Sequence, residues 1–427
     1  MLEKTLFLIF LYLPFQVALN PTEGFDLASI RVAILIVFLL WLIKGLKEKN
    51  IPIPFNRITI SIISFLFIAG LSIFWASNAN WGIRKMLFLL SIFPLYFIVS
   101  SINKKSTITL IKFFIWGGFL ASIVGFFQFL LQFIVGINSA TSLWGKIITP
   151  FLGNSFSNAV LENSSWLVSA GGVTLFRSIS FFPDPHMMSF YLNMTAILSL
   201  SIYLQNKTKA YFFIFLFISL VSLLSFSRGG YLGLTSGLFF MLILSSKNLF
   251  YKIKEDFQKY LSVTMIVIST LFLMFIFSNP ISERLSSSFD LEEGSNSERI
   301  EIWKNSLQVV SSNIFMGTGL GNYSLHIKPS ADYREPIYSH NAYLDIAAEI
   351  GMFGLIFWIL VLFFSIKDSL KYFREKHNLV YIGLASAAIS FSVHSFFETA
   401  IYSVHILPSI IMIIAVISSS KNKYENN

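Results

Sequence analysis

The chain has 427 residues, of which 55% are hydrophobic and only 12% are charged, and its mean hydropathy is +0.70. Soluble domains carry about 25% charged residues, so this composition excludes an ordinary soluble protein. The absence of cysteine excludes disulfide bonds and thiolate metal sites. The net charge of +9 is spread along the chain and is not gathered in one basic patch, so no nucleic-acid partner is expected.

Apolar segments of transmembrane length follow one another along the chain. The ten-residue alternation of an outer-membrane barrel is absent. The first segment, "MLEKTLFLIFLYLPFQVALN", lacks a clear small-x-small cleavage site, so we interpret it as a span and not as a signal peptide. We predict an all-α polytopic membrane protein of about twelve helices. They are expected near residues 5–20, 27–43, 58–76, 83–100, 108–136, 186–204, 211–226, 230–246, 260–278, 341–365, 379–397 and 401–419.

The connections between the predicted spans differ in length and in charge. Lysines dominate the short connections, whereas most arginines fall on the opposite side. Because basic residues are retained in the cytoplasm, both termini are predicted to be cytoplasmic and the two long connections to lie outside. The chain then divides into N-terminal transmembrane helices (1–136), a first outer loop (137–185), transmembrane helices with an SRGG turn (186–278), a long helical outer loop (279–340) and C-terminal transmembrane helices (341–427).

The stretch "LSFSRGGYLG", residues 224–233, places an arginine and two glycines between two apolar segments. Arg228 is either an anchor whose charge reaches the membrane interface or a ligand for something anionic. Gly229 and Gly230 are expected to form a turn, to permit positive φ and to let backbone amides approach a ligand.

The stretch "FRSISFFPDPH" precedes the predicted span at 186–204. For Asp184 and His186 a rigid loop is favoured, with Pro185 at the start of the next helix. The sequence leaves two roles for Arg177, a structural one and a ligand-binding one.

The long outer loop carries three further features. "SNSERIEIWKNSLQVV" has apolar residues at helical spacing, so we predict an amphipathic helix with Trp303 at the bilayer interface; Arg299 on it is either a solvated charge or a ligand. "GTGLGNY" (317–323) is interpreted as a glycine-rich turn, because no strand precedes it as a nucleotide-binding loop requires. "DLEE" (290–293) is interpreted as a solvated acidic surface and not as a divalent-ion site.

The stretch "SHNAYLDIAAEIGMFGLIFWI" combines a histidine with polar residues inside a predicted span. Asn341, Asp345 and Glu349 recur at every fourth residue and therefore share one helix face. They line either a wet functional cavity or a polar interface between helices. His340 at the mouth of the span is a candidate general base, because its pKa lies near neutrality.

"SRGGYLGL", "ERIEIW", "GTGLGNY" and "HNAYLDIAAEIGMFGLI" occur in this order and on one predicted face. Together they resemble the O-antigen ligase and O-antigen polymerase superfamily of bacterial inner-membrane glycosyltransferases. The resemblance runs over residues 170–365, whereas the first five spans match only as hydrophobic helices. It implies a GT-C-like fold, essential arginines at Arg228 and Arg299, an essential histidine at His340 and a less strict arginine at Arg177. His186 departs from the pattern, in which many relatives have asparagine.

The resemblance implies that a glycan moves from undecaprenyl diphosphate to an acceptor hydroxyl on the outer face of the cytoplasmic membrane. No cofactor and no metal are expected, because arginine forks suit the oxygens of the departing diphosphate. The acceptor is either lipid A–core, as for a ligase, or another lipid-linked repeat, as for a polymerase, and the ligase is slightly preferred. The alternative class is a secondary transporter or lipid-linked oligosaccharide flippase, whose polar residues are expected near the bilayer midplane.

Overall fold

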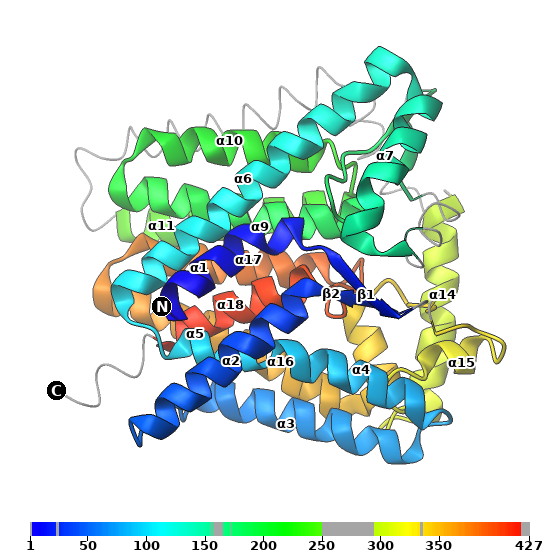
Figure 1. Ribbon diagram of the computed structural model, residues 1–427, viewed down its shortest axis with the longest axis horizontal. Coiled ribbons are helices and arrows are strands. Elements are labelled where there is room, and N and C mark those ends of the chain that lie inside the picture. The colour runs from blue at the N-terminus through cyan, green and yellow to red at the C-terminus, as the bar shows by residue number, and fades with distance from the viewer. Residues whose placement is uncertain are drawn as a thin grey trace.

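The computed structural model describes residues 2–22, 25–154, 157, 165–170, 172–249, 294–333 and 336–419. Helices account for most of these residues (Figure 1). In chain order they are α1 (Leu2–Tyr12), α2 (Ser29–Lys47), α3 (Arg57–Leu71), α4 (Ala79–Ile92), α5 (Pro94–Ser100), α6 (Lys104–Val135), α7 (Ile137–Leu152), α9 (Pro185–Asn206), α10 (Lys209–Leu223), α11 (Arg228–Leu249), α14 (Gly294–Ser312), α15 (Tyr323–Ile327), α16 (Ala342–Lys376), α17 (Leu379–His394) and α18 (Ile406–Ser419).

Strands occur in the described residues only as two small antiparallel hairpins. β1 (Ala18–Thr22) pairs with β2 (Phe25–Ala28), with Ala18 opposite Ala28 and an irregularity before the turn. β3 (Leu167–Ala170) pairs in regular register with β4 (Val173–Phe176). Two short 3-10 helices, Leu13–Phe15 and Ser72–Trp75, complete the described elements. The prediction of a helical fold is confirmed, but the all-α prediction did not include these two hairpins.

Six helices among the described residues are long and apolar enough to cross a membrane: α2, α3 with the 3-10 turn that follows it, α4 with α5, α6, α9 and α16. Three shorter apolar helices are α10, α17 and α18. The predicted span at 260–278 and the acidic "DLEE" stretch lie outside the described residues. The number of about twelve spans therefore stays a prediction.

Two predicted spans are altered by proline. The helix predicted over 5–20 is wrong in its second half: α1 ends at Tyr12, Pro14 lies in a 3-10 turn, and β1 begins at Ala18. The helix predicted over 83–100 is interrupted at Phe93, between α4 and Pro94, which starts α5. Proline has no backbone N–H to donate and its ring collides with the preceding turn, so the α-helix stops in both places.

Helix α9 lies at the centre of the bundle, since 94% of its most apolar stretch of 18 residues is buried. Small residues let its neighbours approach closely. A side chain at Gly118 of α6 would collide with Thr195, one at Gly230 of α11 with Ser189, and one at Gly383 of α17 with Ser201. Close approach through small residues is the usual basis of helix packing in membranes, where lipid tails offer no hydrophobic driving force.

The stretch "GTGLGNY" forms the glycine-rich turn predicted for it. Gly317, Gly319 and Gly321 have φ of 68°, 92° and 75°, a region that side chains disfavour. The turn packs against α16, where a side chain at Gly317 would meet the carbonyl of Glu349. Its role in the fold is therefore architectural.

A break in α16 explains what the glycine-rich turn does. Gly351 has φ 77° and interrupts the helix, which removes the regular partners of nearby carbonyls. The amide of Thr318 donates to the carbonyl of Ala348 at 2.7 Å, and that of Gly319 donates to the carbonyl of Glu349 at 2.9 Å. The turn thus satisfies backbone groups that the break would leave unpaired within an apolar bundle.

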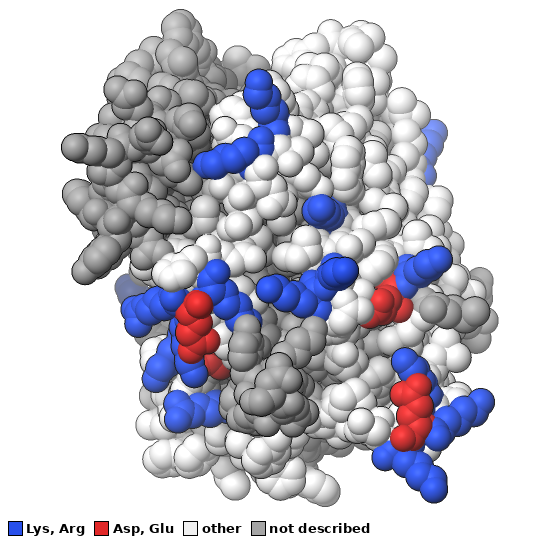
Figure 2. Space-filling view, turned by 90° about the vertical axis from the view of Figure 1, so that its left-hand side faces the viewer, with Lys and Arg blue, Asp and Glu red and all other residues white. Residues whose placement is uncertain are grey.

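The two ends of the helix bundle differ. The β1–β2 hairpin, α7, α14 and α15 lie at one end, and the start of α1 lies toward the other (Figure 1). Figure 2 faces this second end, where Lys and Arg outnumber Asp and Glu. The end of α2 and the starts of α6 and α10 lie toward this end, and these helix termini are the lysines Lys47, Lys104 and Lys209 (Figure 1). The arrangement is the one that basic residues retained in the cytoplasm would give.

Candidate functional site

The segment between α17 and α18, residues 395–405, brings together residues that the sequence places far apart. Its carboxylate, Glu398, is buried, with 10% of the side chain exposed. The carboxylate lies 3.0 and 3.1 Å from Nδ1 of His340. Nη2 of Arg299, from α14, lies 3.9 Å from the same carboxylate. Three chain segments therefore meet at one carboxylate, which we call the Glu398 cluster (His340, Arg299 and Glu398).

His340 occupies a strained and partly exposed position. Its φ is 51°, a left-handed conformation that is uncommon outside glycine, and 43% of its side chain is exposed. With Nδ1 protonated and donating to Glu398, Nε2 of a neutral ring is left as the proton acceptor. The carboxylate thereby fixes both the tautomer and the orientation of the imidazole.

The charges of the cluster shift its acid–base properties. The negative charge of Glu398 raises the pKa of His340 above its usual value, although burial acts in the opposite direction. Burial alone would raise the pKa of Glu398, but the nearby imidazole of His340 and the charge of Arg299 hold it well below its usual range. Glu398 is therefore an anion at neutral pH, and His340 is a stronger base than a solvated histidine.

Arg228 starts α11, and its side chain is partly exposed. The preceding residue caps the helix, since Oγ of Ser227 accepts the amide of Gly230 at 3.1 Å. Next to Arg228, a side chain at Gly229 would come within 2.9 Å of Cβ of Phe397, the neighbour of Glu398. The backbone next to Arg228 therefore packs against the 395–405 segment, which also contacts His340 and Arg299.

Gly229 and Gly230 do not have the role in a turn that the sequence predicts for them. Gly229 and Gly230 lie in the first turn of α11 and neither has positive φ. A side chain at Gly229 would meet His394 of α17, and one at Gly230 would collide with Ser189 of α9. These positions are glycine because three helices cross there closely, and not because the backbone turns.

Arg177 is bound to the backbone just before Arg228. It is 4% exposed, and its guanidinium donates to the carbonyls of Ser225 at 2.7 Å, Ser165 at 2.9 Å and Phe226 at 3.2 Å. Phe226 is itself left-handed, with φ 49°. The guanidinium therefore ties down the strained backbone that leads into Arg228.

The "PDPH" stretch forms the rigid helix start that was favoured for it. Asp184 is the N-cap of α9 and accepts the amide of Met187 at 2.9 Å, with Pro185 in the first turn. Burial, reinforced by the charge of Glu398, raises the pKa of Asp184 to about 6. Nδ1 of His186 lies 2.8 Å from Oγ of Ser227, the cap of α11, so His186 joins two helix starts.

The polar face of α16 is buried and paired. Asn341 caps the helix by accepting the amides of Tyr343 and Leu344. Asp345 accepts the amide of Ser339 at 2.8 Å and the hydroxyl of Thr399.

Glu349, the last residue of this face, forms an ion pair with Lys85 of α4 at 2.7 Å and accepts the hydroxyl of Tyr402 at 3.1 Å. Asp345 and Glu349 are 0% and 3% exposed. The two carboxylates thus act through the residues that they bind.

The helix predicted around Arg299 is confirmed as α14. The indole of Trp303, expected at the bilayer interface, donates to the carbonyl of Ser339 at 3.0 Å. This contact fastens α14 to the residue before His340, which explains how Arg299 reaches the cluster.

Sequence reasoning missed Glu398, Lys85 and Ser227. The signal for Glu398 was present, because "FFETA" places a carboxylate at the boundary between two apolar segments. Lys85 and Ser227 gave no distinct signal, since a basic residue or a serine at a helix end is common. Among the described residues no group of three or more His, Asp or Glu side chains has the arrangement of a metal site.

Residues 212–359 match the family model described as O-Antigen ligase. The matched segment contains Arg228, Arg299 and His340. No curated protein matches the chain. The match confirms the resemblance to the O-antigen ligase and polymerase superfamily, and it supports a membrane protein with an O-antigen ligase-like or polymerase-like function.

Proposed function

We propose that this protein is a membrane glycosyltransferase that moves a glycan from undecaprenyl diphosphate to an acceptor hydroxyl on the outer face of the bacterial cytoplasmic membrane. The observation that carries the proposal is the Glu398 cluster, in which a carboxylate-oriented histidine meets an arginine beside the start of α11. The family match over residues 212–359 supports the same reaction class.

Arg228 and Arg299 bind the donor diphosphate in this mechanism. As the bond between the anomeric carbon and the diphosphate oxygen breaks, negative charge grows on the phosphate oxygens. Planar guanidinium groups donate paired hydrogen bonds to such oxygens and stabilise the charge where it develops. The N-terminus of α11, at Arg228, adds the positive end of a helix dipole.

His340 is the general base. Its Nε2 takes the proton from the acceptor hydroxyl while the oxygen of that hydroxyl bonds to the anomeric carbon and undecaprenyl diphosphate leaves. Glu398 holds the ring and stabilises the imidazolium that forms, as the carboxylate of a catalytic triad does. His340 can release the proton to solvent because it is partly exposed.

Arg177 is a positioning residue in this scheme. Its guanidinium donates to backbone carbonyls just before Arg228, so it sets the direction from which Arg228 approaches the donor. The neutralisation of the diphosphate is assigned to the arginines, without a metal or cofactor. We favour lipid A–core over a second lipid-linked repeat as the acceptor, in line with the description of the matched family.

Reconstitution in liposomes tests the reaction class. The purified protein, given lipid-linked glycan and acceptor, should form a new glycan–acceptor product and release undecaprenyl diphosphate. Movement of the lipid-linked glycan between leaflets without a new bond would instead identify a transporter or flippase. Deletion in the native cells separates the two transferases: a ligase loss leaves long lipid-linked polymer, and a polymerase loss leaves single repeats.

Labelling of a single introduced cysteine tests the sidedness. Ser311 is exposed on α14, and the natural chain has no cysteine to interfere. The Ser311→Cys variant should react with an impermeant thiol reagent from the outside of intact cells. Reaction only after the cytoplasmic side is opened would contradict the placement of the active site.

A further inference from the structure

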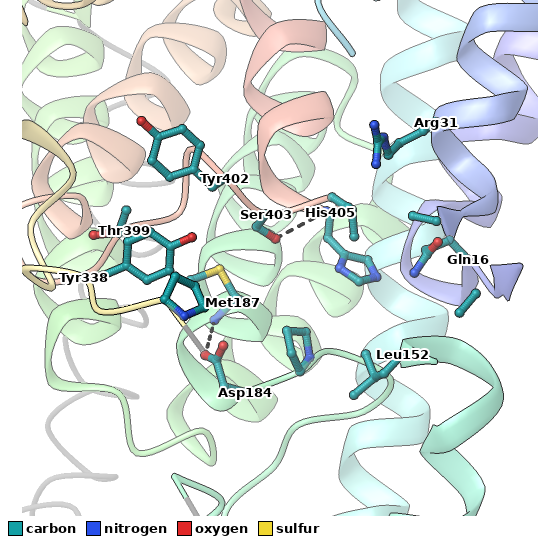
Figure 3. Close-up of a pocket in the computed structure, with 15 residues that line it drawn as sticks. Gln16, Arg31, Leu152, Asp184, Met187, Tyr338, Thr399, Tyr402, Ser403 and His405 are labelled. Carbon is teal, nitrogen blue, oxygen red and sulfur yellow. Dashed lines mark hydrogen bonds between the residues drawn. The ribbon is translucent and has the colours of Figure 1, made fainter. Parts of the chain in front are cut away.

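A cavity of about 290 Å³ is lined in part by residues of the 395–405 segment and by Tyr338 (Figure 3). Its walls come from the β1–β2 hairpin and its flanks, from the end of α7, from the start of α9 and from the 395–405 segment. None of His340, Glu398, Arg299 and Arg228 lines it. It connects to the cluster through two wall residues, since Thr399 follows Glu398 in the chain and Tyr338 lies two residues before His340.

Buried polar atoms in this wall have no partner among the described residues. Gln16 is 3% exposed and His405 is 1% exposed. Oε1 of Gln16 and both ring nitrogens of His405 make no hydrogen bond there. Buried polar groups are hydrogen-bonded in the great majority of cases, because an unpaired one costs about 1–3 kcal/mol. Both residues line the same cavity, so a rotation of either side chain would offer its polar atoms to the hydroxyl groups of a ligand.

Other wall groups are held in fixed orientations. The hydroxyl of Thr399 donates to Asp345, and that of Tyr402 donates to Glu349 at 3.1 Å. The ammonium of Lys85 lies 3.5 Å from the centre of the Tyr402 ring. The buried carboxylates of α16 therefore have a role at this cavity, because they orient its hydroxyl-bearing residues.

The side chains that line the cavity favour one class of ligand. Tyr338 and Tyr402 stack on each other with ring centres 6.1 Å apart, and they present aromatic surface next to amide and hydroxyl groups. Charge is balanced, with one cation, Arg31, and one carboxylate, Asp184. Nε of Arg31 donates to Oγ of Ser91 at 2.8 Å, and with a carboxylate in the same wall the lining has no excess of positive charge that would select a phosphate. A lipid chain would leave the polar atoms unpaired.

We propose that this cavity is a sugar-binding subsite that holds one hydroxyl-rich ring of a glycan substrate while the neighbouring ring reacts at His340. The volume, at the lower end of the roughly 300–1,000 Å³ of ligand pockets, suits a single ring. The assignment rests on the proposed function for its substrate. The ring belongs either to the acceptor or to the glycan released from the donor, and a binding experiment distinguishes these two sources.

Binding of native glycans, measured without any transfer reaction, tests the subsite. Two labelled pools are taken from cells that make the protein: the acceptor glycan, and the donor glycan cut from its diphosphate by mild acid. Immobilised full-length protein in detergent should retain one pool, which identifies the source of the ring. Gln16→Leu and His405→Leu should each weaken that retention about tenfold, because each removes a hydrogen-bonding group from the bound sugar.

Three further variants make the result specific. Ala18→Phe should also abolish retention, since it fills the cavity and leaves every polar group in place. Tyr191→Phe is the matched control, because the hydroxyl of Tyr191 is also buried and unpaired among the described residues but lies off the cavity. It should retain the glycan as wild type does. His340→Ala should bind normally and fail only in transfer.

Two outcomes would overturn the subsite. One is retention of neither pool by the wild-type protein, and the other is retention of a pool that Gln16→Leu, His405→Leu and Ala18→Phe all leave unchanged. Failure of the proposed function looks different, because glycan would then bind through the cavity without any transfer by the wild-type protein.

Discussion

At each end of the polar face of α16 a carboxylate is paired with a basic side chain, but the two pairs differ in how much of them is exposed. At its start, His340 meets Glu398 with 43% of the imidazole side chain exposed. Two turns further along, Glu349 meets Lys85 with only 4% and 10% of the two side chains exposed. The first pair has an accessible nitrogen that can exchange a proton. The second is closed by Tyr402, so it can hold the structure but cannot reach a substrate. The two pairs therefore differ both in the basic residue, histidine against lysine, and in the exposed fraction of its side chain.

The largest effect is expected at the exposed end. His340→Ala should lower the rate of glycan transfer by about 10²–10⁴-fold, because it removes the general base, while donor binding survives through the arginines. Single-turnover assays at saturating donor and acceptor measure this. The protein level in the membrane is the control and should match wild type. Normal turnover by the alanine variant would make His340 a structural residue.

The buried end should respond in stability instead. Lys85→Met leaves the Glu349 carboxylate buried without its cation, which costs about 3–5 kcal/mol. The midpoint of thermal unfolding in detergent should fall markedly. The double variant Lys85→Met with Glu349→Leu should recover much of the loss, because no charge remains buried. A single variant as stable as wild type would show that the pair does not hold the bundle.

The arginines beside the exposed end should be sensitive to shape as well as charge. Arg228→Lys and Arg299→Lys should each lose most transfer activity, about tenfold or more, because an ammonium cannot donate two parallel hydrogen bonds to a diphosphate. The rate of product formation measures this at equal protein level. Lys207→Arg, at the end of α9, is a matched control at the other end of the bundle and should be silent. Full activity of both lysine variants would reduce these arginines to generic charges.

The smallest effect concerns pH. Because Glu398 raises the pKa of His340, and the base acts only when neutral, wild-type activity should fall as the pH drops through a value above 6.5. Glu398→Gln removes the negative charge, so this fall should move to lower pH while the maximal rate declines by about tenfold or less. Rate profiles between pH 5 and pH 9 measure the shift. A fall at the same pH in both proteins would exclude His340 as the titrating base.

Some residues of the candidate site could be predicted from the sequence, and others could not. Arg228, Arg299 and His340 were identifiable because each lies in a short recognisable stretch at a predicted helix boundary. Glu398 was missed although "FFETA" carries a signal, because its role depends on His340, which is 58 residues away in the chain. The partner of Glu349 is 264 residues away. The spacing of carboxylates along a helix does not show whether water or a lysine faces them.

Local properties of the chain determined the class of protein. Hydropathy and the placement of lysines are read along the chain, and they predicted a helical membrane protein. The order of the motifs predicted the resemblance to the O-antigen ligase and polymerase superfamily, which the family match over residues 212–359 supports. Proline at residue 14 and the closely packed glycines of α11 were also visible, but their consequences depend on neighbours.

Only the tertiary structure decided which polar groups are accessible. It turned Arg177 toward backbone carbonyls, closed the Lys85–Glu349 pair, and brought Gln16 and His405, from opposite ends of the chain, to one cavity. The physical reason is that the free energy of a charge or a hydrogen-bonding group depends on the surfaces that fold around it, and those surfaces come from helices distant in sequence.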